Sequence, residues 1–380
     1  MANDPLAILG DYDFELPESS IAQAPASERA AARLLVLDRT TGRVLTPDGD
    51  ERVRDLPEWL RPRDLLVVNA TRVLAARLIG RKATGGTAEV LLLGPAKDSP
   101  GRGNDFRALL KCTGRAREGL HLRLGREPAL RASVVAIHQR GEVTLRFEAA
   151  ADPYAQGEAP LPPYIRRDAG AARSALGVAD LDRYQTVYAR APGAIAAPTA
   201  GLHLTDALFA RLRERGIERA EVVLHVGAGT FRPLDADALE SGRLHREAFE
   251  LPEPTVEAID RTRAEGGRIV AVGTTTTRVL ESCVDEEGRL HAGVGDTDLF
   301  IRPGGAPFRV VDALLTNFHL PRSSLLLLVA AFVGREPLLD AYREAVERGF
   351  RFYSYGDAML IVPQECQRLS ERAPRSEERT

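Results

Sequence analysis

Three histidines lie in segments where small and polar residues leave room for a ligand. His203 stands two residues before a predicted helix cap at Thr205. His225 lies in a β-rich run that leads into Gly-Ala-Gly, and His319 lies in the segment LLTNFHLPRSS. Imidazole has an ordinary pKa near neutrality and therefore suits proton transfer. A histidine near a helix cap serves a structural hydrogen bond as readily, so position alone leaves both interpretations open for His203.

A run of four threonines forms a second candidate site. Gly273 ends an apolar run, and the threonines begin the predicted helix that follows. The unpaired N–H groups of a helix start favour a carboxylate or phosphate, and a neighbouring arginine adds a charged fork. An unusually rich helix cap is the alternative. The candidate ligand-binding residues here are Thr274, Thr275, Thr276, Thr277 and Arg278.

Three further loops combine small and polar residues that allow a ligand close to the backbone. The Gly-Ala-Gly turn suggests a nucleotide-binding loop, but FRPLDADAL does not open a helix directly at the glycines, so we reject a Rossmann site. Ser323 or Ser324 is expected to cap the apolar helix that follows LLTNFHLPR. The candidate binding residues of these loops are Thr199, Gly201, Gly227, Gly229, Asn317 and Arg322.

Alternating strands and helices must position these loops after about residue 180. The spacing of apolar residues, together with capping residues, predicts five helices: TDALFARLRERG, PTVEAIDRTRAEGG, TTTTRVLESCV, LLLLVAAFV and PLLDAYREAVERGF. The intervening runs AEVVLHVGAG, RIVAVG, VDALLTN and DAMLIV predict strands. Repeated β–loop–α units indicate a mixed or largely parallel sheet, and the loops after parallel strands share one rim. RLLVLDRTTGRVL predicts a hairpin near the amino terminus.

The segment between residues 61 and 150 has a different character. Its short runs AEVLLLG, DFRALLKC, LHLRLG, ASVVAIH and EVTLRFEA predict a small all-β barrel or sandwich. It carries 17 Lys and Arg against 8 Asp and Glu, a balance of +9 in a chain whose net charge is −3. Such an excess is typical of a phosphate-binding surface, and a solvated basic face is the alternative. Arg102, Lys111 and Arg115 are the candidate phosphate contacts.

Several classes of protein and site lack their signatures in the sequence. The seven histidines never show the spacings that single elements use to bind a metal, and the three cysteines are far apart. The most apolar run, residues 325–333, is much shorter than the roughly 20 residues of a membrane helix. With no visible secretory signal, we expect a cytoplasmic protein with reduced thiols, no metal and no membrane contact.

Longer motifs add a resemblance to a known family. In order along the chain they are IAQAP, RLLVLDR, DLLVVNATRVLAARLIGRK, TGGTAEVLLL, YQTVYARAPGAIAAPTAGLHLT, LHVGAGTFRPL, VGTTTTR, GDTDLFIRPG, VDALLTNFHLPRSSLLLLVAAF and YSYGDAMLI. They resemble the S-adenosylmethionine:tRNA ribosyltransferase-isomerases of queuosine biosynthesis. The resemblance covers roughly residues 11–362.

The resemblance implies a mixed α/β, barrel-like catalytic domain interrupted by a small all-β barrel. We expect the α/β domain at 1–70 and 155–365, the basic barrel at 71–154 and a disordered tail at 366–380. The implied reaction adds the ribosyl part of S-adenosylmethionine to 7-aminomethyl-7-deazaguanine at the tRNA wobble position and releases adenine and methionine. We expect a monomer that uses S-adenosylmethionine as a consumed substrate, without other cofactors. On this hypothesis, His203 and His319 transfer protons and His225 is a third possibility.

Three departures from the family pattern stand out. Ala70 occupies the place of the family's usual Asp, Leu204 replaces a usual Phe, and residues 244–250 differ from the usual Met-His-Ser-Glu pattern. An enzyme of the same fold acting on a free deazaguanine, or an RNA-binding homologue without activity, therefore remains an alternative. The basic insert argues against the free base, and the intact carboxy-terminal loops argue against lost activity.

Overall fold

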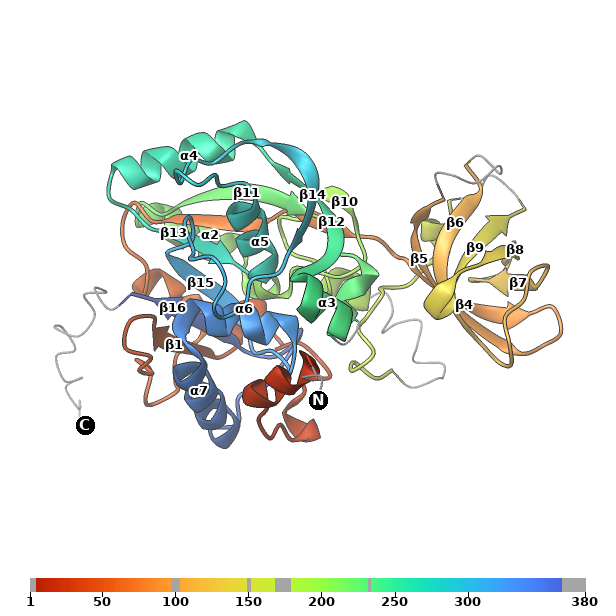
Figure 1. Ribbon diagram of the computed structural model, residues 1–380, viewed down its shortest axis with the longest axis horizontal. Helices are drawn as coiled ribbons and strands as arrows, with labels where there is room; N and C mark the ends of the chain where they lie inside the picture. The colour runs from red at the N-terminus through yellow and green to blue at the C-terminus, as the bar shows by residue number, and fades with distance from the viewer. Residues whose placement is uncertain (1–4, 97–102, 149–151, 168–178, 232–233, 364–380) are drawn as a thin grey trace, which may run out of the picture.

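The computed structural model describes residues 5–96, 103–148, 152–167, 179–231 and 234–363. Two bodies are visible in Figure 1, a larger α/β domain and an all-β barrel that stands to one side of it. The predicted fold class, mixed α/β interrupted by a small β-barrel, is confirmed. Within the described ranges, no helix has both the length and the apolar composition needed to cross a bilayer.

An eight-stranded mixed sheet forms the centre of the α/β domain. Its strands are β1 (Leu34–Asp38), β2 (Leu65–Asn69), β11 (Glu218–Leu224), β12 (Arg243–Leu251), β13 (Ile269–Val272), β14 (Gly293–Leu299), β15 (Ala313–Asn317) and β16 (Ala358–Val362). They lie in the order β1-β16-β15-β13-β2-β11-β12-β14. The four strands β15, β13, β2 and β11 run parallel, and β2, β13 and β15 are buried along their whole length because both faces are covered.

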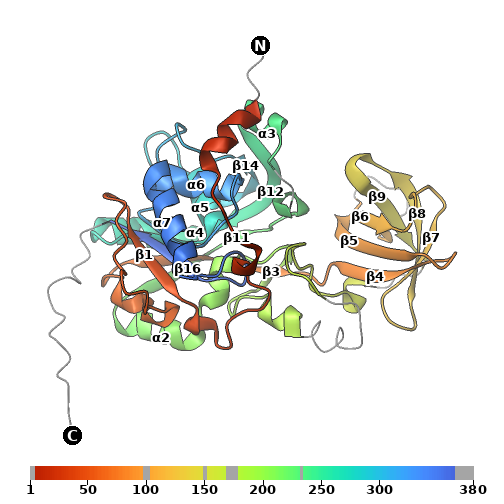
Figure 2. The same cartoon turned by 90° about the horizontal axis from the view of Figure 1, so that it is seen from below.

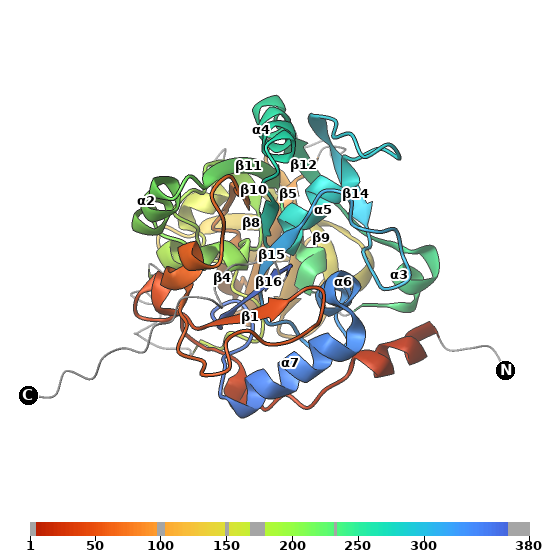
Figure 3. The ribbon, with the colours of Figure 1, turned by 90° about the vertical axis from the view of Figure 1, so that its left-hand side faces the viewer.

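Helices cover both faces of this sheet, and each face has its own apolar cluster. The helices are α2 (Asp206–Glu214), α3 (Ala236–Ser241), α4 (Glu253–Ala264), α5 (Thr274–Ser282), α6 (Ser324–Val333) and α7 (Arg335–Glu347). Buried residues of α4 to α7 pack on one face. Residues of α2 and of the 3-10 helix η4 (Val53–Glu58) pack on the other. Figure 3 shows α2 and α7 on different sides of the strands.

Short 3-10 helices connect many of these elements. Besides η4 they are η1 (Pro5–Tyr12), η2 (Glu18–Ser20), η3 (Arg29–Ala31), η5 (Gln139–Gly141), η6 (Pro153–Gln156), η7 (Thr199–His203) and η8 (Ala228–Phe231). Two of them, η7 and η8, lie in loops that the sequence marked as candidate binding sites.

The barrel is a closed antiparallel sheet of six strands. They are β4 (Arg77–Lys82), β5 (Thr87–Pro95), β6 (Asp105–Cys112), β7 (His121–Leu124), β8 (Leu130–Ile137) and β9 (Glu142–Phe147), closed in the order β4-β5-β6-β9-β8-β7. Alternate residues such as Leu78, Val90, Leu122 and Leu145 are buried inside it. All five runs predicted as strands in this segment form strands, because their alternation of apolar and polar residues matches the pleat.

A narrow connection joins the two domains (Figure 2). The chain leaves β2 and, after Ala70, forms β3 (Thr71–Val73), which pairs in parallel with β10 (Ala191–Ala194). A single bridge between Arg77 and Glu158 links the outgoing and returning chain at the base of the barrel. The entrance to the barrel therefore lies directly beside the end of β2.

Several local predictions are confirmed at their capping residues. The Thr205 hydroxyl accepts a hydrogen bond from Leu208 N–H at the start of α2, and Gly216 beyond its end has φ +73°. Ser323 caps α6 by accepting from Leu326 N–H. These residues satisfy helix ends that would otherwise leave backbone groups unpaired.

The hairpin predicted from RLLVLDRTTGRVL is present but short: Asp38 N–H donates to the Arg43 carbonyl and Leu45 N–H donates to the Val36 carbonyl, and residues 43–45 form no full strand. Val44 makes only a single bridge to Leu37, whereas β1 pairs along its whole length with β16. The sequence patterns also gave no indication of β12 and β14, which carry many charged and exposed residues.

Candidate active site

One edge of the central sheet collects the polar residues that end its parallel strands. β2 ends at Asn69, β11 at Leu224, β13 at Val272 and β15 at Asn317. Because these strands are parallel, their carboxyl ends lie at the same edge, where ligands bind in α/β folds. The loops that follow carry all three candidate histidines or their hydrogen-bond partners.

Asn69 connects β2, β11 and α5 at this edge. Its Nδ2 donates to the Leu224 carbonyl at 3.0 Å and to the Thr275 hydroxyl at 3.2 Å. Its Oδ1 accepts from the N–H groups of Leu224 and Thr71 at 3.0 and 3.1 Å. The side-chain amide is fully buried, and both its nitrogen and its oxygen are hydrogen-bonded. Asn69 therefore fixes the positions of Thr71 and Thr275.

His225 forms a hydrogen-bonded chain with Thr71. The Thr71 hydroxyl lies 2.8 Å from His225 Nδ1 and 3.5 Å from the Ala191 carbonyl oxygen. A hydroxyl that donates to this carbonyl accepts from Nδ1–H, which leaves the Nε2 lone pair of His225 available as a base. Burial lowers the pKa of His225, and the Glu250 carboxylate partly opposes this effect. A Cβ on Gly193 would approach the imidazole to 2.7 Å, so glycine is required there for the ring to fit.

His203 lies against Asn317, at the end of β15. Asn317 Nδ2 is 3.1 Å from His203 Nε2 and also donates to the carbonyls of Tyr353 and Asp357 at 3.2 and 3.4 Å. These two acceptors orient the amide, so Nε2 of His203 accepts and its proton sits on Nδ1. Burial lowers the pKa of His203 to about 4, although the Asp357 carboxylate acts in the opposite direction. His203 is therefore a neutral hydrogen-bond donor at neutral pH.

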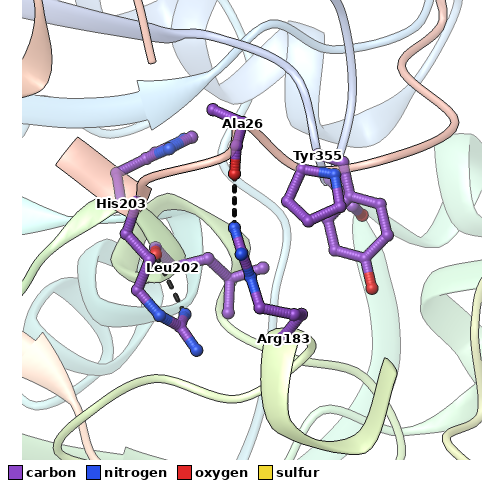
Figure 4. A pocket seen from close by; sticks show the side chains of 8 residues that line it. Ala26, Arg183, Leu202, His203 and Tyr355 are labelled. Carbon is purple, nitrogen blue, oxygen red and sulfur yellow. Dashed lines mark hydrogen bonds between the residues drawn. The ribbon is translucent and has the colours of Figure 1, made fainter. Parts of the chain in front are cut away.

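A pocket with two arginines opens next to His203 (Figure 4). Arg183 donates to the Ala26 carbonyl, and Arg29 donates to the Leu202 carbonyl at 3.1 Å. Tyr355 lines the pocket as well. Nearby, Oδ1 of Asn317 is buried and has no hydrogen-bond partner among the described residues. An acceptor left in this way is suited to a donor group of a ligand.

His319 is placed apart from His203, because it bonds to the opposite side of β15. Its Nε2 lies 2.9 Å from the Thr316 hydroxyl, and its backbone N–H donates to the Tyr342 hydroxyl at 3.0 Å. Burial alone lowers the pKa of His319 to about 3. The structure therefore brings Asn317 and His203 together and places His319 in a separate, apolar environment.

The threonine run divides into two pairs. The hydroxyls of Thr276 and Thr277 donate to the Val272 and Gly273 carbonyls at 2.8 and 3.1 Å, and both side chains are fully buried. They serve the backbone of α5. Thr275 accepts from Asn69 and is partly exposed, and Thr274 lies in the first turn. Since the N-cap residue Gly273 has no side chain to cap the helix, the first N–H groups of α5 remain suited to an anion.

Arg278 is held inside the protein by Glu247. Its Nη1 forms an ion pair with the Glu247 carboxylate, Nε donates to the Leu299 carbonyl at 3.1 Å, and both charged side chains are buried. The other Glu247 oxygen accepts from Gly227 N–H at 2.9 Å. Arg278 therefore supports the glycine loop through Glu247, and its guanidinium is not presented to a ligand.

Gly201 and Gly229 are needed for close packing, whereas a Cβ on Gly227 would meet only Glu247 Oε1, at 4.0 Å. A Cβ on Gly201 would lie 1.9 Å from the Tyr188 hydroxyl, and one on Gly229 would lie 2.4 Å from the His245 ring. After Gly227 the chain forms η8, and α3 begins only at Ala236, which agrees with the absence of a Rossmann helix at these glycines. Thr199 is partly buried at the start of η7.

The structure also shows the surroundings of Arg322 and Ala70, two positions that the sequence analysis singled out. Arg322 has φ +58°, is exposed, and forms an ion pair with Asp13 of the amino-terminal segment. Ala70, at the position of a usual Asp, is fully buried in the apolar cluster that includes Tyr188. The alanine therefore completes an apolar surface.

The three candidate phosphate contacts lie in or near the barrel. Arg102 falls outside the described residues. Lys111 and Arg115 are exposed, and Lys111 stands opposite Glu89 of the neighbouring strand. Glu89 itself forms an ion pair with Arg77 at 2.7 Å.

Thr71 and Glu247 are candidate functional residues that the sequence analysis did not select. Thr71 follows a buried strand, and a hydroxyl at that point is the signal that would have found it. Glu247 lies in β12 among other charged residues, and nothing in the sequence distinguishes it from a solvated carboxylate.

Known proteins are similar to this chain over nearly its whole length. A family model described as queuosine biosynthesis protein matches residues 9–361. The chain is 49% identical to an S-adenosylmethionine:tRNA ribosyltransferase-isomerase of Syntrophotalea carbinolica, covering 93% of this chain and 99% of the relative. It is 51% identical to one of an Azoarcus species, with 93% and 97% covered. A solved S-adenosylmethionine tRNA ribosyltransferase of Thermotoga maritima is 35% identical, with 93% and 100% covered and a TM-score of 0.51.

Proposed function

The chain belongs to the queuosine biosynthesis protein family, and we propose that it is an S-adenosylmethionine:tRNA ribosyltransferase-isomerase. Its substrate is then tRNA with 7-aminomethyl-7-deazaguanine at the wobble position. The ribosyl part of S-adenosylmethionine is transferred and isomerised to give epoxyqueuosine-tRNA, adenine and methionine. The observation that carries this proposal is identity near 50% over almost the full length of relatives with that name.

The chemistry needs a base near the sugar of S-adenosylmethionine. The sulfonium acidifies the C5′ protons, and removal of one gives an ylide that helps to expel adenine. His225 is the candidate best suited to take this proton, because its Nε2 lone pair is free while Thr71 holds Nδ1. The pKa of His225 is lowered by burial, which keeps the ring neutral and ready to accept.

His203 and Asn317 are suited to binding rather than to proton removal. His203 Nε2 is occupied by Asn317, so its Nδ1–H can donate to a ring nitrogen such as those of adenine. The unpartnered Oδ1 of Asn317 can accept from an amino group. Together they present one donor and one acceptor, the pattern by which a purine edge is recognised. His319 stays in the proposal as a residue that shapes the loop after β15.

The start of α5 is the proposed site of the methionine carboxylate. Its N–H groups and the partly exposed Thr275 favour an anionic group. Thr276, Thr277 and Arg278 act through the backbone and the glycine loop. The scheme needs no group beyond S-adenosylmethionine, which is consumed.

The barrel is the proposed contact for tRNA. Its positive balance suits a polyanion, and Arg102, Lys111 and Arg115 are the contacts first proposed from the sequence. We expect one chain to suffice for both domains to engage one tRNA, so a monomer is proposed.

One assay distinguishes the possible activities. The protein is incubated with labelled S-adenosylmethionine and an anticodon stem-loop that carries the wobble 7-aminomethyl-7-deazaguanine, and adenine release is measured. Release that requires the stem-loop is the expected result. Release with the free deazaguanine alone would assign the activity to a small-molecule substrate, and RNA binding without any release would contradict the proposed reaction.

A further inference from the structure

Three arginines stand side by side across the outside of the barrel. In the β4–β7 pair, Arg81 is directly opposite Arg123, and in the β7–β8 pair, Arg123 is directly opposite Arg131. All three side chains are exposed. Residues directly opposite in adjacent strands have Cβ atoms about 5 Å apart, so the three form one continuous row about 10 Å long. We name this set the arginine row.

The arginine row differs from the other arginines of the barrel strands. Arg77 is paired with Glu89, Arg107 with Glu142, and Arg146 with Asp105. In the described part of the chain, no hydrogen bond or ion pair links an arginine-row guanidinium to a carboxylate. At one end of the row, Glu148 follows β9 and its N–H donates to the Arg131 carbonyl at 3.0 Å.

Like charges directly opposite one another destabilise a sheet. A strand position on the outside of a barrel accepts almost any polar residue, so folding does not require three arginines there. Their repulsion is relieved when an anion with several charges lies across them. Guanidinium groups match phosphate oxygens with paired N–H donors, which makes a phosphate backbone the suitable partner.

We propose that the arginine row binds successive phosphates of the tRNA backbone. This inference rests on the proposed function, since the tRNA is the polyanion that the reaction supplies. It places the main electrostatic contact on β4, β7 and β8. Lys111 lies on β6, outside the arginine row.

The test measures RNA affinity as a function of salt. In the full-length protein, Arg81→Gln, Arg123→Gln and Arg131→Gln are combined, and binding of a tRNA lacking the wobble modification is titrated from 0.05 to 0.3 M salt. Each lost phosphate contact should lower affinity about five- to eightfold at 0.1 M salt, because each contributes about 0.7–0.9 to the salt slope. The triple variant should therefore bind about 100- to 500-fold more weakly, with a slope smaller by about two to three.

A control with equal charge loss separates local contact from net charge. Arg261→Gln, Arg289→Gln and Arg343→Gln remove three exposed arginines from the α/β domain. This control should keep most of the affinity and slope. The arginine-row variant should not melt at a lower temperature than the wild type, since repulsion is removed.

Two results would overturn the inference. One is an unchanged salt slope in the arginine-row variant, which would leave an acidic protein surface as the partner of the row. The other is an equal loss of affinity in the control. Failure of the proposed function looks different: the wild type would bind tRNA through the row but release no adenine from S-adenosylmethionine.

Discussion

The three candidate histidines differ in their burial and in the hydrogen-bond partners of their ring nitrogens. Burial lowers the pKa of His203 to about 4 and that of His319 to about 3, and in each the Nε2 atom has a side-chain partner. A base with so low a pKa removes a carbon-bound proton poorly, because catalytic efficiency rises with basicity. His225 lies closer to solvent, with Nδ1 held by Thr71. Residue-level geometry therefore favours His225 for proton removal.

Replacement of Thr71 tests whether this orientation matters. In Thr71→Val the acceptor for Nδ1–H is lost, so the ring can adopt the wrong tautomer and kcat should fall about tenfold or more. The protonated imidazole loses more from the missing acceptor than the neutral one does, which lowers the pKa of His225 further. The rise of kcat with pH should then occur at lower pH than in the wild type. Adenine release measured from pH 5 to 8 checks both effects.

The conservative variant supplies the control for Thr71. Thr71→Ser keeps the hydroxyl and should restore most of kcat and the wild-type pH profile. If valine and serine variants lost activity equally with unchanged pH profiles, the hydroxyl would serve packing only. His225 would then lose its support as the base.

At the scale of elements, the sequence predicted what apolar patterns encode. The strands that end at Asn69, Val272 and Asn317, and the helices that follow the last two, come from long apolar runs with capping residues. The sequence did not predict β12 and β14, because strands in an exposed antiparallel extension have little apolar pattern. Because these two strands were not predicted, the environment of Arg278 could not be predicted either. Its ion-pair partner Glu247 lies in β12, and the Leu299 carbonyl that accepts from its Nε lies in β14. The predicted ligand role of Arg278 therefore could not be corrected from the sequence.

Closure of the barrel depends on a glycine in β4. A Cβ on Gly80 would lie 2.0 Å from the Arg123 carbonyl oxygen and 2.8 Å from the Leu124 Cα, both backbone atoms of β7. Gly80→Ala must therefore push β4 and β7 apart, at a cost of about 1–3 kcal/mol or more. The unfolding temperature should fall, and tRNA affinity should fall with it because the arginine row spans this pair of strands. Gly10→Ala, which meets nothing within 4 Å, serves as the control in the same melt. Equal melting of both variants would contradict the close approach of β4 and β7.

At the scale of the whole molecule, the barrel has its own core. Its buried apolar residues lie between Ala76 and Phe147 and form a cluster separate from the two clusters of the central sheet. Across the domains, Arg140 of the barrel lies 3.3 Å from Asp235, but both side chains are largely exposed. Such pairs contribute little to stability. Little therefore couples unfolding of one domain to unfolding of the other.

Separate cores predict two unfolding transitions, each sensitive to substitutions in one domain only. Leu145 is fully buried in the barrel and Leu315 is fully buried in the sheet, so each change to alanine should cost about 2–5 kcal/mol of the stability of its own domain. In calorimetry, Leu145→Ala should lower one transition temperature and Leu315→Ala the other. At a temperature where only the barrel of Leu145→Ala is unfolded, tRNA affinity should be lost while S-adenosylmethionine still raises the remaining transition, because a ligand stabilises only the domain that binds it. One shared transition that moves with both variants would instead mean that the domains unfold as a single cooperative unit.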